Sequence, residues 1–314
     1  MKKLILKFGI LTAIVSLFAC SDEEMATHQE SQNTKVSITD APIDNAEVSA
    51  AFVTISDVKV NGTSIEGFTK TTVDLMQLQN GNKKLLGNID LNATSVSNMS
   101  LVLDYDQDVN GNAPGCYIKT ANGMKHELKS SLKEFKIKDK ADIFLSDANE
   151  LVIDFNLRKT IMENQQNPND NYDFVSNTEM SAGLRFVNSL ETGSISGTVQ
   201  DQNNTSDKII VYAYKKGTYN SNEAKEQGTS KIRFANAVTS SAVSSTGNYT
   251  VSFLKEGDYE FHFASYEENN LSGEMEFKGM LEVTSLSAIQ TDFLQVSSNL
   301  NLSLNVIIKG RVNG

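Results

Sequence analysis

The chain has 314 residues, of which 39% are hydrophobic and three are proline, and its formal net charge is −11. This length predicts two compact domains, and the apolar content is sufficient for two cores but too low for a membrane protein. The acidic charge argues against nucleic acid as a partner, because a phosphate backbone binds basic surfaces.

Residues 1–19, MKKLILKFGILTAIVSLFA, have the pattern of a secretory signal peptide. Lysines open the segment, an apolar stretch follows, and a small residue, Ala19, precedes Cys20. The apolar stretch is too short and too one-sided for a membrane span. The alternative is an ordinary signal peptide followed by an incidental cysteine.

The run Leu17-Phe18-Ala19-Cys20 resembles the lipobox of bacterial lipoproteins. The resemblance implies cleavage before Cys20, a diacylglycerol on its sulfur and an acyl chain such as palmitate on its amine. Each buried methylene contributes about 0.8 kcal/mol, so two or three chains form a stable anchor. Ser21 fits sorting to the outer membrane, and the acids at 22–24 resemble the export tag of surface lipoproteins in Bacteroidetes-type bacteria. We therefore expect an outer-membrane lipoprotein that is anchored through lipid and exposed on the cell surface.

Cleavage would remove three of the 28 basic residues and no acid, which leaves 25 against 39 acids and a charge of −14. Residues 20–34 have no apolar periodicity and predict a disordered tether, in which His28 needs no special role. Cys116 is the other cysteine. We expect it to be a small buried apolar residue, with a reactive thiol as the alternative.

From Lys35 onward the hydrophobic pattern has a period of two, which is typical of β-strands. Ala51, Val53 and Ile55 alternate with polar residues, and Val58 and Val60 continue one step out of phase. A bulge near Ser56-Asp57 would return both sets to one face.

Further strands are predicted along the rest of the chain. The alternating residues are Leu101, Leu103 and Tyr105; Leu151, Ile153, Phe155 and Leu157; Tyr249, Val251 and Phe253; Tyr259, Phe261 and Phe263; and Leu302, Leu304, Val306 and Ile308. Helical spacing occurs only around VDLMQLQNG, which predicts a short turn. The fold class is therefore all-β, with two β-sandwiches in series of prealbumin-like or immunoglobulin-like type. The expected domains are residues 35–190 and 191–314, joined at NSLETGS.

Three segments of the N-terminal domain carry a family resemblance. They are VSITDAPIDNAEVSAAFVTISDVKVNG, VDLMQLQNGNKKLLGNIDL and LVIDFNLRKTIMEN, and they resemble the bacterial family called domain-of-unknown-function 4382 over about residues 35–190. The resemblance implies an exported lipoprotein with a prealbumin-like sandwich, and it implies no reaction.

The C-terminal domain is similar to carboxypeptidase-regulatory-like or prealbumin-like modules. The segments that carry this similarity are GSISGTVQD, KIIVYAY and TGNYTVSFLKEGDYEFHF. It implies a stalk or a binding module that accompanies another domain.

The segment DYDQDVNGN is the best candidate for a metal site. Asp106, Asp108, Asn110 and Gly111 follow the start of a calcium loop, in which alternate oxygens converge on the ion. The twelfth position should be a bidentate glutamate but is Tyr117. The alternative is a solvated hairpin tip with its turn at Asn110-Gly111. We expect weak calcium binding at most and no other cofactor.

Three further polar positions, one of them the pair His126-Glu127, have simpler explanations. Asp40 could recognise a ligand, but a turn closed by its carboxylate before Pro42 is the expected role. His126-Glu127 begins like a zinc-protease motif but lacks the second histidine. His262 alternates with Phe261 and Phe263, so it should face solvent.

No nucleophile elbow, cysteine–histidine pair or glycine-rich phosphate loop is present, so we assign no catalytic residue. Two polar loops, residues 163–173 and 216–230, could recognise a sugar or a protein, although each could be a plain connection. The expected function is a non-catalytic binding or presentation module for an extracellular glycan, protein or matrix. The alternatives are a fimbrial or assembly subunit and a hydrolase that uses paired carboxylates.

Overall fold

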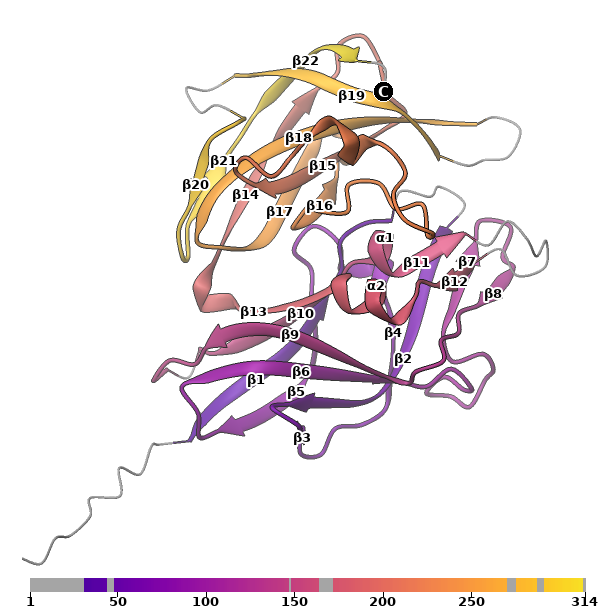
Figure 1. Ribbon diagram of the computed structural model, residues 1–314, viewed down its shortest axis with the longest axis vertical. Coiled ribbons are helices and arrows are strands. Elements are labelled where there is room, and N and C mark those ends of the chain that lie inside the picture. Colours follow the sequence, from indigo (N-terminus) through magenta and orange to yellow (C-terminus); the bar gives the residue numbers. More distant parts are fainter. Residues whose placement is uncertain are drawn as a thin grey trace, which may run out of the picture. The chain divides into compact units, whose positions relative to one another are not determined.

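The computed structural model describes residues 31–43, 48–146, 148–163, 172–269, 275–286 and 291–312 (Figure 1). The predicted signal peptide, the lipidation site Cys20 and residues 20–30 of the predicted tether lie outside the described residues, whereas residues 32–34 of that tether belong to a strand. Ser31–Gly314 form one compact unit. Its first strand begins at Gln32, three residues before the expected start of the first domain.

The prediction of an all-β protein is confirmed. Before residue 192 the strands are β1 Gln32–Thr39, β2 Val48–Val60, β3 Thr63–Ser64, β4 Thr71–Asp74, β5 Lys84–Leu91, β6 Ser95–Leu103, β7 Tyr117–Thr120, β8 Lys125–Glu127, β9 Glu134–Asp142, β10 Glu150–Phe155, β11 Ile161–Glu163, β12 Tyr172–Phe174 and β13 Leu184–Asn188. The short helices there are η1 Leu75–Leu78, α1 Leu157–Thr160, α2 Asn177–Ala182 and η2 Ser189–Glu191.

These strands form a sandwich with one continuous core. One sheet has the order β13-β10-β1-β5, and the other has the order β8-β7-β2-β6-β9 with β3 and β4 also paired to β2. The alternate apolar residues of both sheets, among them Ile38, Ile153, Val53 and Leu101, are buried in a single cluster. Burial of this apolar area is the main stabilising contribution to the sandwich.

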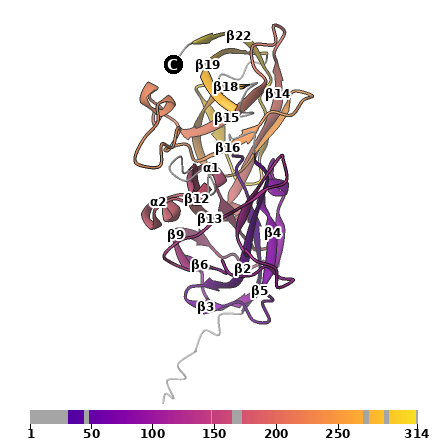
Figure 2. The same ribbon diagram turned by 90° about the vertical axis from the view of Figure 1, so that its right-hand side faces the viewer.

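After Glu191 the chain builds a second set of strands. They are β14 Thr192–Gln200, β15 Lys208–Lys215, β16 Thr239–Ala242, β17 Asn248–Lys255, β18 Gly257–Glu268, β19 Met275–Ser285, β20 Leu294–Val296, β21 Asn301–Ser303 and β22 Val306–Val312, with a short helix η3 at Ser221–Ala224. The sheet order is β16-β15-β18-β19-β22-β14-β17. None of the described strands pairs across the division at residue 191 (Figure 1 and Figure 2).

Two local predictions are confirmed. The register of β2 against β6 shifts between Ile55 and Asp57, which is the expected bulge. The segment around VDLMQLQNG forms the single turn η1, and the Asp74 side chain caps it by accepting a hydrogen bond from the backbone N–H of Met76.

Three strand predictions need correction. Phe253 has a φ of +57°, so a bulge turns it away and places Leu254 in the core instead. Leu157 does not continue β10 but begins helix α1. The predicted last strand is two strands, β21 and β22, and both pair in parallel with β14.

Buried and half-buried polar side chains link the two sets of strands. Arg185 pairs with Asp154 at 2.8 Å and donates a second hydrogen bond to the backbone carbonyl of Phe253. Lys159 donates to the carbonyl of Ala237 at 2.6 Å, and Arg158 donates to the carbonyl of Arg233. These charge-assisted bonds fix the short helix α1 against the segment that follows η3.

Candidate ligand-binding groove

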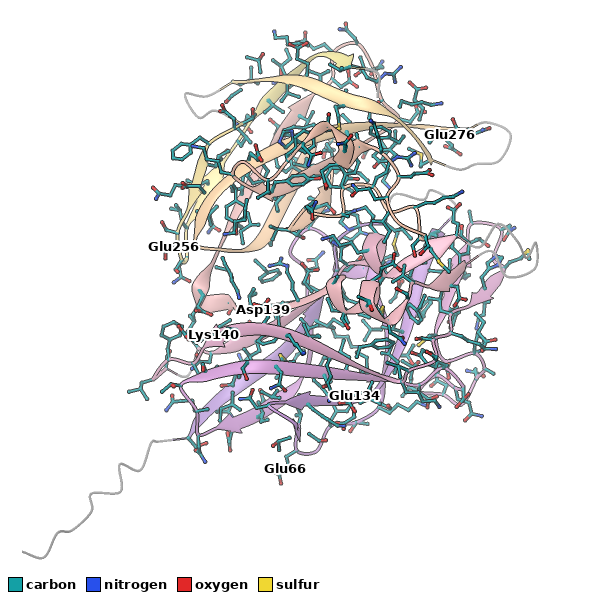
Figure 3. The ribbon with its side chains drawn as sticks, viewed as in Figure 1. Glu66, Glu134, Asp139, Lys140, Glu256 and Glu276 are labelled. Carbon is teal, nitrogen blue, oxygen red and sulfur yellow. The ribbon has the colours of Figure 1, made fainter. Side chains whose placement is uncertain are left out.

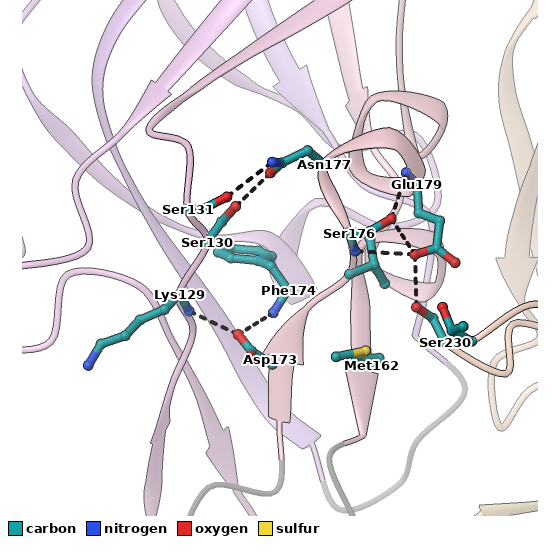
Figure 4. A pocket seen from close by; sticks show the side chains of 12 residues that line it. Lys129, Ser130, Ser131, Met162, Asp173, Phe174, Ser176, Asn177, Glu179 and Ser230 are labelled. Atoms are coloured by element: carbon teal, nitrogen blue, oxygen red, sulfur yellow. Dashed lines mark hydrogen bonds between the residues drawn. The ribbon is translucent and has the colours of Figure 1, made fainter.

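A groove of about 480 Å3 opens to solvent beside helix α2 (Figure 4). Three separate parts of the chain line it: the segment after β8, the segment from β11 to α2, and the loop after β15. Most of its side chains carry a hydroxyl, an amide or a charge. The lining residues are Lys129, Ser130, Ser131, Met162, Asp173, Phe174, Val175, Ser176, Asn177, Glu179, Thr229 and Ser230.

Asn177 joins one wall of the groove to the start of helix α2. Its side-chain carbonyl accepts from the Ser130 hydroxyl at 2.9 Å, and its amide donates to the Ser131 hydroxyl at 3.1 Å (Figure 4). Each hydroxyl keeps further hydrogen-bonding capacity, since an oxygen of this kind can both donate and accept.

Asp173 lies at the next wall. Its carboxylate accepts hydrogen bonds from the backbone N–H groups of Phe174, at 2.9 Å, and of Lys129, at 3.4 Å. The Phe174 ring is buried and belongs to the sandwich core, whereas Met162 is partly exposed. Asp173 is therefore fixed by the backbone on both sides.

Glu179 closes the groove on the side of the second set of strands. Ser176 and Glu179 form a capping box at the start of α2, in which each side chain bonds the backbone N–H of the other. The Glu179 carboxylate also accepts from the hydroxyls of Ser176, at 2.7 Å, and of Ser230, at 2.9 Å. Burial raises the pKa of Glu179, but these hydrogen bonds lower it by more, so the pKa lies below its ordinary value.

A buried glutamate organises the loop that supplies Ser230. Glu223 accepts hydrogen bonds from the Tyr214 hydroxyl, at 3.1 Å, and from the backbone and side-chain N–H groups of Asn236, at 2.9 and 2.6 Å. Phe234 inserts from the same loop and stacks on Tyr212, with ring centroids 4.0 Å apart. The predicted polar loop at 216–230 is thus anchored through a small core of its own.

The predicted calcium residues do not converge. Asp106 is 77% exposed and pairs with Lys133, whereas the Asp108 carboxylate accepts from the backbone N–H groups of Asn110 and Asn112. Gly111 has a φ of +82°, as the hairpin alternative requires. In the part of the chain that the structure describes, no three His, Cys, Asp or Glu side chains are grouped for a metal ion. Weak calcium binding stays a prediction.

The other singled-out residues lie away from the groove lining. Asp40 accepts a hydrogen bond from the Leu157 backbone N–H at 3.1 Å, which caps the start of α1, and burial raises the pKa of Asp40 well above its ordinary value. His262 does not face solvent freely, because the Tyr219 ring stacks on its imidazole with ring centroids 3.6 Å apart.

The two remaining singled-out side chains are buried. His126 packs edge-on against Tyr172, with ring centroids 5.3 Å apart. Cys116 is buried as expected, and desolvation raises the pKa of its thiol to about 12. Such a thiol is a packing residue rather than a nucleophile.

The groove contains residues that sequence reasoning did not single out. Ser176 and Glu179 carry the spacing of a capping box, which could have predicted α2. Ser130 and Ser131 have no such local signal. Residues 164–171 of the predicted loop at 163–173 lie outside the described residues. The structure brings Asp173, at the end of that loop, and Ser230, from the predicted loop at 216–230, to one groove.

Comparison with known proteins identifies part of the chain. Residues 33–175 match the family model described as Domain of unknown function (DUF4382), which confirms the resemblance for that segment. No curated protein matches. The similarity of the second half to carboxypeptidase-regulatory-like modules stays a prediction.

The structural matches are remote. The Bacillus anthracis TIE protein is 12% identical with a TM-score of 0.19, and the match covers 89% of this chain and 34% of that one. BcpA, the major pilin subunit of Bacillus cereus, is 11% identical with a TM-score of 0.21, over 88% of this chain and 70% of that one. This chain therefore spans about a third of the first of these proteins. Among the described helices, none is both long and apolar enough to cross a membrane.

Proposed function

We propose that the protein is a non-catalytic, lipid-anchored module of the outer membrane that binds an extracellular glycan in the groove beside α2. The observation that carries the proposal is a solvent-open groove whose polar side chains are already held by hydrogen bonds to one another (Figure 4). Ligand binding to such side chains costs little further rotamer entropy.

The chemistry of the lining suits a polyhydroxylated ligand. Sugar hydroxyls both donate and accept hydrogen bonds, and the groove offers serine hydroxyls, the Asn177 amide and the Asp173 and Glu179 carboxylates. Met162 adds an apolar surface against which the C–H face of a sugar ring can pack.

The electrostatics of Glu179 argue against its acting as the general acid of a glycoside hydrolase. A hydrolase needs one carboxylic acid whose pKa is raised, so that it can protonate the leaving oxygen. The pKa of Glu179 lies below its ordinary value because hydrogen bonds from Ser176 and Ser230 outweigh its burial. Glu179 is therefore an ionised acceptor at neutral pH.

The anchor is the second part of the proposal. The lipobox-like run that ends at Cys20 supports acylation of that residue, and Ser21 and the following acids support retention at the outer membrane with exposure at the cell surface. A groove on a stiff β-scaffold at the end of a lipid-linked segment suits capture of an extracellular polymer.

The test uses the chain without its first twenty residues on a glycan array, together with a screen for released sugars. We expect retention on a subset of glycans without product. Asn177→Ala and Ser230→Ala should each weaken retention about tenfold, as expected for one lost ligand hydrogen bond. The control is Glu66→Gln, which changes an exposed carboxylate away from the groove lining (Figure 3). Equal retention of all variants, or turnover of a glycan, would contradict the proposal.

A further inference from the structure

The loop after β9 presents two apolar side chains to solvent. Leu145 is 82% exposed and Phe144 is 42% exposed. Leu145 is the most exposed large apolar side chain in the described part of the chain. We call this pair the apolar tip. Two adjacent exposed apolar side chains offer a small surface that can pack against another apolar phase.

A buried asparagine holds the apolar tip in place. The Asn149 side chain accepts a hydrogen bond from the backbone N–H of Phe144 at 3.0 Å and donates to the carbonyls of Phe144 and Ser146 at 2.6 and 2.7 Å. Asn188 donates to Asn149 in turn, at 2.8 Å. The tip is therefore a fixed projection, since its backbone is bonded to buried groups.

Strand β9, which precedes the apolar tip, carries three exposed lysines. Lys136, Lys138 and Lys140 are exposed along this edge strand, and Lys140 pairs with Asp142 on the same strand at 3.1 Å. Figure 3 shows Lys140 on β9. A row of lysines beside exposed apolar residues suits a phospholipid surface, in which headgroup phosphates meet the ammonium groups and acyl chains meet the apolar residues.

The apolar tip lies near the start of the first strand, and this position favours a membrane as its partner. The backbone N–H of Ser146 donates to the Gln32 side chain at 3.1 Å, so the tip lies beside the first residue of β1 (Figure 1). Twelve residues separate Gln32 from Cys20, a span of at most about 40 Å when fully extended. A compact unit of this size has a radius of gyration of about 19 Å. A lipid anchor on Cys20 would therefore leave this corner within about 40 Å of the bilayer.

We propose that the apolar tip and the exposed lysines of β9 dock on the phospholipid bilayer and orient the protein on its membrane. This inference rests on the proposed lipid anchor at Cys20. Tethering raises the effective concentration of the tip at the surface, so a contact of two apolar side chains is sufficient to bias the orientation.

The experiment exploits the absence of tryptophan from the sequence. The chain that begins at Cys20 is coupled through the Cys20 thiol to a maleimide lipid in phosphatidylcholine vesicles, while the buried thiol of Cys116 stays unlabelled. Leu145→Trp then introduces the only tryptophan, and bromine-labelled acyl chains quench it if it enters the bilayer. The matched control is Met124→Trp, at a 53% exposed site in the turn before β8, on the opposite edge of the same sheet.

We expect a blue shift and quenching for Leu145→Trp and neither for Met124→Trp. Without coupling, Leu145→Ser should lower partition of the chain into the same vesicles about tenfold, since one buried leucine side chain is lost. Equal quenching at the two sites would overturn the inference. A dimer in vesicle-free solution that Leu145→Ser abolishes would assign the tip to a second copy and also overturn it. Because the coupling is chemical, this test does not depend on acylation in the cell, which fatty-acid labelling measures separately.

Discussion

Lys159 is an ionisable residue whose titration the fold changes strongly. Burial, followed by repulsion from Arg158, lowers its pKa from 10.5 to about 7. The folded chain therefore loses this proton near pH 7, whereas the unfolded chain keeps it up to about pH 10.5. Unfolding takes up a proton between these values, so the contribution of Lys159 to the free energy of unfolding rises with pH across that window.

This contribution predicts the behaviour of Lys159→Met. The wild type should gain stability relative to the variant as the pH rises from 7 to 9, by up to about 1.4 kcal/mol per unit. Urea unfolding at several pH values measures the difference. A gap between the two proteins that stays constant with pH would show that Lys159 does not titrate in this way.

The second prediction at the residue scale concerns Cys116. Its thiol pKa of about 12 and its burial together predict that it resists maleimide in the native protein and reacts once the chain is unfolded. Mass spectrometry of Cys20→Ala before and after urea gives the result. Rapid native labelling would contradict the buried position.

At the scale of elements, α2 connects stability to the groove. Ser176→Ala removes the N-cap and should lower the free energy of unfolding by about 1 kcal/mol. It also removes a hydrogen bond to Glu179, so glycan retention should fall as well. Thr178→Ala is the control on the same helix, at an exposed position outside the groove lining. Equal losses from both variants would mean that the capping box does not position Glu179.

The period-two pattern predicted most strands because burial on one face fixes it directly. It located the bulge of β2 and the inward residues of β18, where Tyr259, Phe261 and Phe263 are all buried. The pattern predicted the wrong face for Phe253, because a bulge in β17 exchanges the inward and outward faces of the strand there.

The same pattern did not reveal the switch to helix at Leu157. There the alternation continues in the sequence, while the first helical N–H is satisfied by Asp40, which is 117 residues distant. A non-local contact of this kind leaves no local signal.

The groove was predictable only in parts for the same reason. The polar composition of residues 163–173 and 216–230 indicated recognition loops. Helix α2 meets the second of these loops through the hydrogen bond between Glu179 and Ser230, which are 51 residues apart. Ser130 and Ser131 are ordinary surface serines in the sequence and gain a role only through Asn177.

At the scale of the whole molecule, the anchor can be tested in cells. Labelled palmitate should enter the wild type and not Cys20→Ala, which should leave the membrane fraction, because acylation of that sulfur and amine provides the chains that hold the protein. Equal labelling and equal membrane retention would contradict a lipid anchor at Cys20.

The central claim is that the groove beside α2 binds the ligand. Titration calorimetry of a glycan retained on the array, against the wild type, the double variant Asn177→Ala with Ser230→Ala, and Glu66→Gln, tests it most directly. We predict an unchanged Kd for Glu66→Gln and a Kd raised at least about tenfold for the double variant. The same Kd for all three proteins would show that the ligand binds elsewhere.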